Sequence, residues 1–261
     1  MVEKQNVTDT TPIETKEKDL LIKSEKAKKN WAAYKSIEDD MGRIVEYLPL
    51  ETKQYMVFSF KLADIIIRCC TQVESVFKDL VRERMFLENL SKDDYEKLKE
   101  KVDNSKTNIL DFLKAFDNKL NLTKEAFTIR ANGDAFAPFS IFFEDETNKS
   151  IPFWWTTYNK LKHDYSKNLE LANLQAAICA LGSLFILNCK IPYNQETLIL
   201  NGVISSPNFI HIGHFLGYMA QEEKTKIYNV LAQTSIFQYW VSYNLETIGL
   251  TVTGSMQVGS I

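Results

Sequence analysis

Apolar residues recur at steps of mostly three and four between positions 59 and 85, namely Leu62, Ile66, Cys69, Val73, Val76, Phe77 and Leu80. This spacing places them along one side of an α-helix. The opposite side carries the polar residues Arg68, Glu74, Lys78 and Arg82. A helix with one apolar side gains most of its stability by packing that side against other elements. The stretch therefore predicts a long helix within a helical bundle.

A second apolar helix is predicted over 168–189, with a stripe formed by Leu171, Leu174, Ile178, Leu181 and Phe185. Gly182 and Ser183 have small side chains, which allow a neighbouring element to approach closely. The apolar run at 176–189 is shorter than the roughly 20 residues that a membrane-spanning helix requires. We therefore expect this helix to lie in the core of an all-α domain.

Shorter helices are predicted around these two. Ser36 is typical of an N-cap, because acidic residues follow it and Pro49 ends the apolar pattern, so we expect a helix over 36–48. Ser91 predicts another helix over 91–102, and a further amphipathic segment covers 107–116. Between 121 and 151 the pattern stops, and Asn132 and Gly133 separate two short apolar runs. This arrangement predicts a short hairpin-like insertion.

The distribution of charge suggests three parts of the chain. Residues 1–34 are rich in charged residues and are expected to form a flexible leader. Residues 35–190 carry the helical pattern and form the predicted domain. Residues 191–261 are a charge-poor extension of uncertain fold, in which 227–241 fits a helix or a strand and 250–261 fits a strand or a loose tail.

Composition excludes several classes of protein. The chain has 31 basic and 34 acidic residues, a formal net charge of -3, so it lacks the overall positive charge that is typical of nucleic-acid-binding proteins. Any such binding must be local. The first residues lack the apolar segment of a secretory signal. We therefore expect a soluble, cytoplasmic protein without a membrane segment.

Cysteine and histidine spacing gives little support for a metal site or a cofactor. The four cysteines have neither CxxC nor zinc-finger spacing and lie in apolar segments, so we expect reduced thiols in the core. His211 and His214 are three residues apart, and no carboxylate lies beside them to complete a metal site. We expect neither a metal nor a cofactor.

The stretch WWTTYNKLKHDY at 154–165 combines aromatic, basic and amide side chains. A helix over 152–166 is predicted, because Ser150 and Pro152 suit its N-terminal end. At about 100° per residue, an apolar side is then formed by Trp154, Tyr158, Leu161 and Tyr165. A bordering sector holds Trp155, Asn159, Lys162, His163 and Ser166. This sector fits either a functional site or a polar helix with a buried structural histidine.

The segments CCTQVESVFKDL and PFWWTTYNKLKHDY, with the apolar helix after them, resemble the HEPN family over residues 35–190. The resemblance implies a compact all-α domain that cleaves RNA without a metal and that dimerises across its motif. It also implies a prokaryotic defence or toxin–antitoxin setting with a cognate antitoxin or defence partner. The family motif is an arginine, commonly followed by asparagine, with a histidine a few residues later. Asn159 and His163 match it, whereas Tyr158 stands in place of the arginine.

This departure from the motif changes the expected chemistry. An arginine holds phosphate with a planar, permanently charged group, whereas a tyrosine offers one neutral hydroxyl. An imidazole still transfers protons at neutral pH. The candidate catalytic residues are therefore His163, Asn159 and Tyr158. The candidate substrate-binding residues are Lys162, Lys160, Trp155, Glu74 and Lys78.

Two classes of function fit these observations. The first is a HEPN-like ribonuclease, or an RNA-binding relative that has lost catalysis. The second is a non-catalytic helical module that dimerises or docks a partner, with Trp154 and Trp155 as interface anchors in a homodimer. An open position for Lys162 and His163 favours the first class, and their burial under the C-terminal part favours the second.

Overall fold

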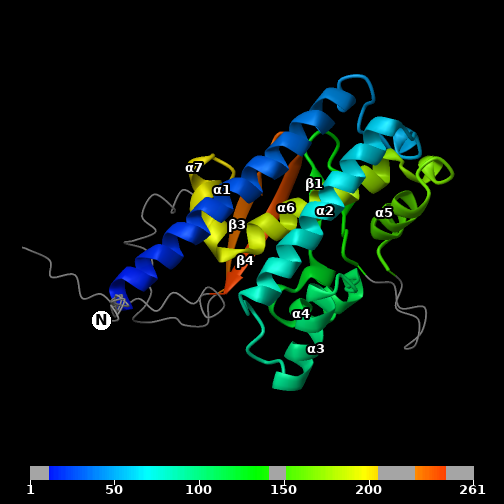
Figure 1. Ribbon diagram of the computed structural model, residues 1–261. Coiled ribbons are helices and arrows are strands. Elements are labelled where there is room, and N and C mark those ends of the chain that lie inside the picture. Colours follow the sequence, from blue (N-terminus) through cyan, green and yellow to red (C-terminus); the bar gives the residue numbers. More distant parts are fainter. Residues whose placement is uncertain (1–11, 141–150, 205–226, 245–261) are drawn as a thin grey trace, which may run out of the picture.

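The computed structural model describes residues 12–140, 151–204 and 227–244 (Figure 1). These residues form α-helices and a small antiparallel sheet that share one apolar core. The helices are α1 (Pro12–Val45), α2 (Phe60–Arg82), α3 (Lys92–Asp103), α4 (Ile109–Leu120), α5 (Phe153–His163), α6 (Leu174–Lys190) and α7 (Gln195–Leu200). The strands are β1 (Phe127–Ile129), β2 (Ala135–Phe136), β3 (Ile227–Gln233) and β4 (Phe237–Asn244). Single turns of 3-10 helix lie at Thr52–Gln54, Leu122–Lys124, Leu169–Leu171 and Pro192–Asn194.

The centre of the molecule is the pair α2 and α6. Ser59 caps the N-terminal end of α2, since its Oγ accepts a hydrogen bond from the backbone N–H of Leu62 at 3.1 Å. Nearly every residue of α6 is buried, and this helix contacts α1, α2, α5 and β4. Because α2 contacts both α5 and α6, the predicted packing of these three helices is confirmed.

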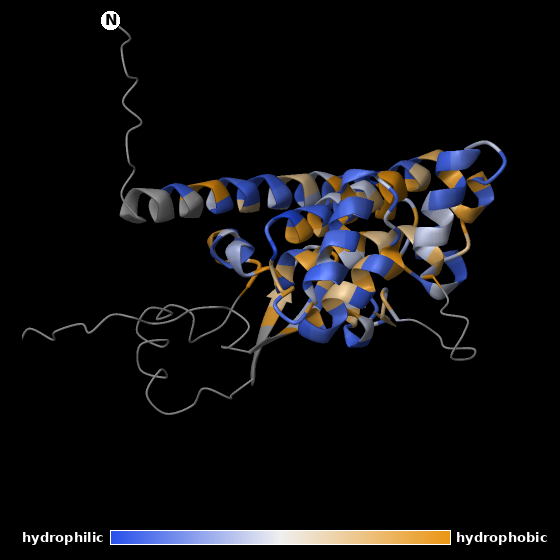
Figure 2. Ribbon diagram, turned by 60° about the horizontal axis from the view of Figure 1, so that its bottom comes forward, coloured by the Kyte–Doolittle hydropathy of each residue, from blue (hydrophilic) through white to orange (hydrophobic). Residues whose placement is uncertain are grey.

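The helix α1 corrects the prediction for the N-terminal part. It runs without a break from Pro12, so the expected flexible leader is wrong from that residue onward. Ser36 lies in the middle of this helix rather than at an N-cap, and its Oγ accepts a hydrogen bond from Arg68 at 3.1 Å. No proline or glycine interrupts the chain from Ile13 to Met41, so nothing ends the helix there. Figure 2 shows α1 reaching past the other helices at its N-terminal end.

The two shorter helices follow their sequence signals. Ser91 caps α3 by accepting a hydrogen bond from the N–H of Asp94 at 3.1 Å. At the start of α4, Asn108 and Asp111 form a reciprocal capping box. The predictions for 91–102 and 107–116 are therefore confirmed within one to four residues at their ends.

The predicted hairpin is present, and it belongs to a larger sheet. Strands β1 and β2 pair around a turn in which Gly133 has a φ of +78°. Strand β1 also pairs with β4, so the sheet order is β2-β1-β4-β3. The prediction of an all-α fold is correct for the helical bundle and wrong for this four-stranded sheet. The sequence of residues 227–241 fits either a helix or a strand, and in the structure these residues lie in the hairpin of β3 and β4.

The sheet packs against α6 at a glycine. A Cβ atom at Gly182 would overlap the ring of Phe127 on β1, so only glycine permits this contact. The ring of Phe127 also lies edge-on to Phe237 on β4, with ring centroids 4.7 Å apart. The predicted close approach at Gly182 is therefore confirmed. The described part of 191–261 is built into the same core as the helices.

Two helix boundaries around the motif differ from the prediction. The helix expected over 152–166 ends at His163, and the helix expected from 168 begins at Leu174. Asn173 ends the intervening segment, because its Oδ1 accepts a hydrogen bond from the N–H of Ala176 at 2.9 Å and so caps α6. Among the described helices, none is by itself long and apolar enough to span a membrane. Helix α6 and the segment Pro192–Leu200 together reach that length and apolar character, but the two are bent by 90° relative to each other.

Candidate functional site

Helix α5 packs against α2 and α6, and most side chains of its first half are buried. Trp154 is fully buried, and its Nε1–H donates a hydrogen bond to the carbonyl oxygen of Pro138 at 2.6 Å. The side chain of Trp155 is also buried and lies edge-on to Trp154, with centroids 5.6 Å apart. The expectation that these tryptophans anchor a homodimer interface is therefore wrong, because both rings are used inside the chain. Trp155 is for the same reason inaccessible to a substrate.

Tyr158, at the position of the motif arginine, is part of a largely buried network. Only 3% of its surface is exposed, and its hydroxyl donates a hydrogen bond to Glu74 Oε2 on α2 at 3.4 Å. Glu74 Oε1 in turn lies 2.6 Å from Lys78 Nζ. The predicted neighbourhood of Glu74 and Lys78 with the motif helix is therefore present. Because the carboxylate lies beside Tyr158, this position offers no positive charge to a phosphate.

Lys162 contacts the ring of Tyr158 and is exposed to solvent. Its Nζ lies 4.8 Å from the centroid of the Tyr158 ring, a cation–π contact, while the residue as a whole is exposed. Among the described residues Lys162 forms no ion pair. Its charge remains available to an anion that approaches the end of α5.

The last turn of α5 presents basic side chains to solvent. Lys160, Lys162 and His163 are all exposed, and Asn159 is half-buried. Cations at the C-terminal end of a helix are favoured by the helix dipole. The carbonyl oxygen of Lys160 is already satisfied, because Asn168 Nδ2 donates a hydrogen bond to it at 3.0 Å. The side chains of this turn are therefore the groups that remain for binding.

The predicted sector is only partly present. Ser166 lies beyond the end of the helix and Trp155 is buried, so the five residues do not form one accessible surface. The candidate residues divide instead into a packed group and an exposed group. In the packed group, Trp155 and Tyr158 are buried and Glu74 and Lys78 are half-buried. The exposed group is Lys160, Lys162 and His163, and Asn159 lies between the two groups.

The four cysteines lie in the core. Cys69, Cys70, Cys179 and Cys189 are all buried. Burial raises the pKa of the Cys179 thiol to about 12, so this group is protonated at neutral pH. Within 12–140, 151–204 and 227–244, no group of three His, Cys, Asp or Glu side chains is placed to hold a metal ion. His211 and His214 lie outside the described residues.

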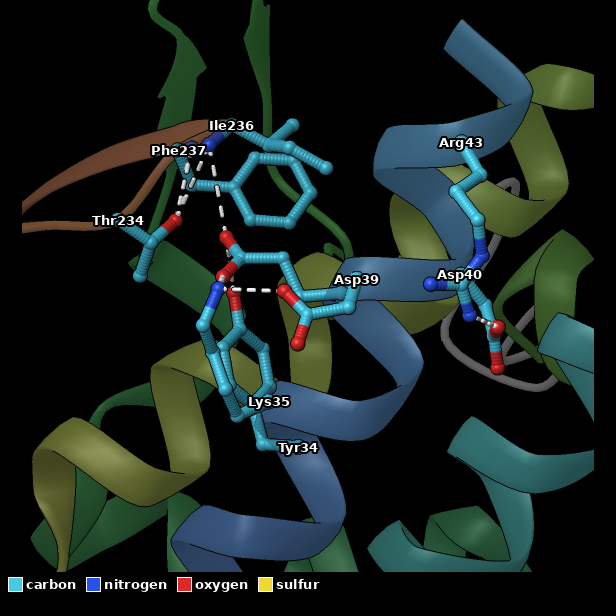
Figure 3. A network of polar contacts seen from close by, with 9 residues as sticks. Tyr34, Lys35, Asp39, Asp40, Arg43, Thr234, Ile236 and Phe237 are labelled. Carbon is cyan, nitrogen blue, oxygen red and sulfur yellow. Dashed lines mark hydrogen bonds and ion pairs between the residues drawn. The ribbon is translucent and has the colours of Figure 1, made fainter.

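A buried acid at Glu38 was not identified from the sequence (Figure 3). It is 1% exposed and accepts hydrogen bonds from the Tyr34 hydroxyl at 3.2 Å and from the backbone N–H of Ile236 at 3.4 Å. Burial, and after it the charge of Glu38, raise the pKa of Tyr34 well above its ordinary value, so its hydroxyl remains a donor. These contacts tie α1 to the turn between β3 and β4. The sequence feature that could have identified this contact is the four-residue spacing of Tyr34 and Glu38, which places both on the apolar side of α1.

Two aromatic residues near the motif were also not identified as a pair. Phe60, the first residue of α2, stacks on Tyr165 with ring centroids 6.2 Å apart and an interplanar angle of 16°. Tyr165 was assigned to the apolar side of the motif helix, but it lies two residues beyond the end of α5. The two residues are 105 positions apart, so no local sequence pattern indicated that their rings are in contact.

Comparison with protein-family models, with curated proteins and with solved structures gave no match to this chain. The resemblance to the HEPN family therefore rests on the residues of α2, α5 and α6 alone.

Proposed function

We propose that this chain is a HEPN-like RNA-binding protein that contacts the phosphate backbone with the exposed end of α5. The observation that carries the proposal is the separation within α5 between a buried half and a basic last turn. Lys160 and Lys162 supply positive charge, and neither forms an ion pair among the described residues. Phosphate contacts of this kind supply a large part of the affinity of proteins for nucleic acids.

Binding is better supported than cleavage. The motif arginine is replaced by Tyr158, which is buried beside Glu74, so the charged clamp for a reacting phosphate is missing. His163 is exposed, and an imidazole in such a position is able to exchange protons with a ribose hydroxyl or a leaving oxygen. Any metal-independent ribonuclease activity of the chain is therefore assigned to His163, with Asn159 as the residue that orients it.

The proposal is tested by fluorescence anisotropy with labelled single-stranded RNA at low salt. The double variant Lys160→Ala/Lys162→Ala is expected to bind about tenfold more weakly, because two phosphate contacts are lost. The matched control is Lys92→Ala, which removes an exposed lysine at the start of α3, a helix that packs near the other end of α2. Equal affinity of the double variant and the wild type, or no RNA binding by the wild type, would contradict the proposal.

The second candidate is a helical interaction module that forms a homodimer. It is favoured by Ile151 and Phe153, which are exposed at the start of α5 although both are large and apolar. Sedimentation velocity of the wild type and of Phe153→Ser separates the candidates. A dimer that dissociates in the variant, combined with no affinity for RNA, supports the interaction module.

The biological setting is part of the same proposal. A cognate antitoxin or defence partner, a prokaryotic defence or toxin–antitoxin system and a cytoplasmic location all follow from the resemblance to the HEPN family. No residue of the described structure identifies such a partner.

A further inference from the structure

The stacked pair Phe60 and Tyr165 lies directly beyond the basic end of α5. Phe60 is 67% exposed, which is unusual for a phenylalanine that already contacts another ring. Tyr165 follows His163 by two residues and is half-buried. In Figure 1, α5 lies beside the N-terminal part of α2, where Phe60 begins that helix. One side of the pair is therefore open to solvent.

The backbone around the pair holds its position. The Tyr165 hydroxyl donates a hydrogen bond to the carbonyl oxygen of Phe60 at 3.4 Å. The segment before Phe60 pairs with the segment before α6, because the N–H of Leu174 donates to the carbonyl oxygen of Val57 at 2.9 Å. The aromatic surface is therefore fixed before any ligand arrives, which lowers the entropy lost on binding.

Four lysines lie close to the two aromatic residues in the sequence. Lys61 follows Phe60, Lys160 and Lys162 lie in the last turn of α5, and Lys167 follows Tyr165. All four are exposed, and none forms an ion pair among the residues that the structure describes. The acids nearby are Asp64, which pairs with Arg68, and Asp164 and Glu170. This surface is more basic than a chain with a net charge of -3 would predict.

We propose that Phe60 and Tyr165 form a stacking platform for unpaired bases, so that the RNA bound at the end of α5 is single-stranded. This inference rests on the proposed function and specifies its substrate class. Flat rings flanked by lysines suit a base and its phosphates together. In a duplex the bases are already stacked on one another and are not free to stack on the platform. The platform therefore binds single-stranded RNA in preference to duplex RNA. A purely apolar protein partner would leave the four lysines without counter-charges.

The test compares a labelled oligouridylate with the duplex of oligouridylate and oligoadenylate, by anisotropy. Wild type binds the single strand more tightly than the duplex. Phe60→Leu keeps an apolar side chain but removes the ring, and it weakens single-strand binding about tenfold while leaving duplex binding unchanged. A control variant binds like wild type: Trp240→Leu removes another exposed aromatic ring, on β4 and outside the platform.

The outcomes separate this inference from the proposed function. Absence of binding to both probes overturns both. Binding that is equal for single strand and duplex, or that is unaffected by Phe60→Leu, overturns the platform and leaves the phosphate contacts of Lys160 and Lys162 standing. Dissociation of a dimer by Phe60→Leu, with RNA affinity unchanged, also overturns it and assigns the surface to a second copy of the chain.

Discussion

Charged residues are used in opposite ways in two regions of the molecule, around Glu38 and at the end of α5. The carboxylate of Glu38 is buried, and it accepts hydrogen bonds from α1 and from the turn between β3 and β4. The side chains of Lys160, Lys162 and His163 are exposed and form no ion pair among the described residues. Both regions lie on helices that pack in the same core.

The difference shows which polar residues are structural and which are available for binding. A buried charge must have partners, because its desolvation costs several kcal/mol without them. An exposed lysine without a partner adds little to stability, so its role lies in what it contacts outside the chain. The region around Glu38 should therefore respond to mutation in stability and the end of α5 in RNA affinity.

The largest effect is expected for Glu38→Ala. The Tyr34 hydroxyl loses its acceptor on Glu38, whereas the N–H of Ile236 keeps Thr234 Oγ1 at 3.3 Å as a second acceptor. A buried group that loses its partner costs about 1–3 kcal/mol, so we expect the free energy of unfolding to fall by roughly 2 kcal/mol, measured by urea denaturation. Glu38→Gln keeps an acceptor oxygen and should lose less. A loss below about 0.5 kcal/mol for Glu38→Ala would show that the region does not hold α1 to the sheet.

A smaller effect is expected at Tyr158, which lies in the buried part of α5. Tyr158→Phe removes the hydrogen bond to Glu74 but keeps the ring beside Trp155. The expected loss of unfolding free energy is about 0.5–1 kcal/mol, with RNA affinity unchanged, because Glu74 keeps its ion pair with Lys78. Chemical denaturation and anisotropy on the same sample measure both quantities. A loss of RNA affinity without a loss of stability would move Tyr158 from the structural group into the site.

The smallest effect is expected at Asp40, close to Glu38 on α1 (Figure 3). Hydrogen bonds from Arg68 and then Arg43 lower the pKa of this carboxyl below its ordinary value. Figure 3 shows the contact of Arg43 with Asp40. Its contribution is therefore present above the unfolded pKa of about 3.9 and is lost as the pH falls through the folded value. Because the pair is exposed, the contribution is only about 0.2–1 kcal/mol.

Asp40→Asn should accordingly lose less stability than wild type when the pH is lowered from about 5 to about 3. Urea denaturation at a series of pH values measures the two slopes. Parallel slopes would show that Asp40 makes no net contribution from its ion pairs.

The sequence predicted local helices well and long-range contacts poorly. The stripe of α2 and the cap at Ser91 depend on neighbouring residues, and both are present. The pairing of β1 with β4 joins segments that are 110 positions apart at Thr128 and Gln238, and no local pattern encodes it. Ser36 was misassigned because an acidic turn after a serine resembles a helix start even in the middle of a helix.

The candidate site was predicted as a set of residues but not as a surface. Periodicity placed Tyr158 and Leu161 on the core side correctly, and it placed Trp155 too near the solvent. The buried state of Trp155 depends on distant parts of the chain, because both α2 and α6 pack against α5. The stacking of Phe60 on Tyr165 depends on a chain reversal after His163 that the predicted longer helix excluded.

The most direct test of the account is the variant His163→Ala, measured for stability and RNA together. Because His163 is exposed at the end of α5, the free energy of unfolding should change by less than about 0.5 kcal/mol. Cleavage of RNA in the presence of a chelator, where wild type shows it, should fall by about 10²- to 10⁴-fold, as for loss of a general acid or base. A variant that unfolds, from a wild type that neither binds nor cleaves RNA, would show that His163 is a structural residue and that the end of α5 is not a site.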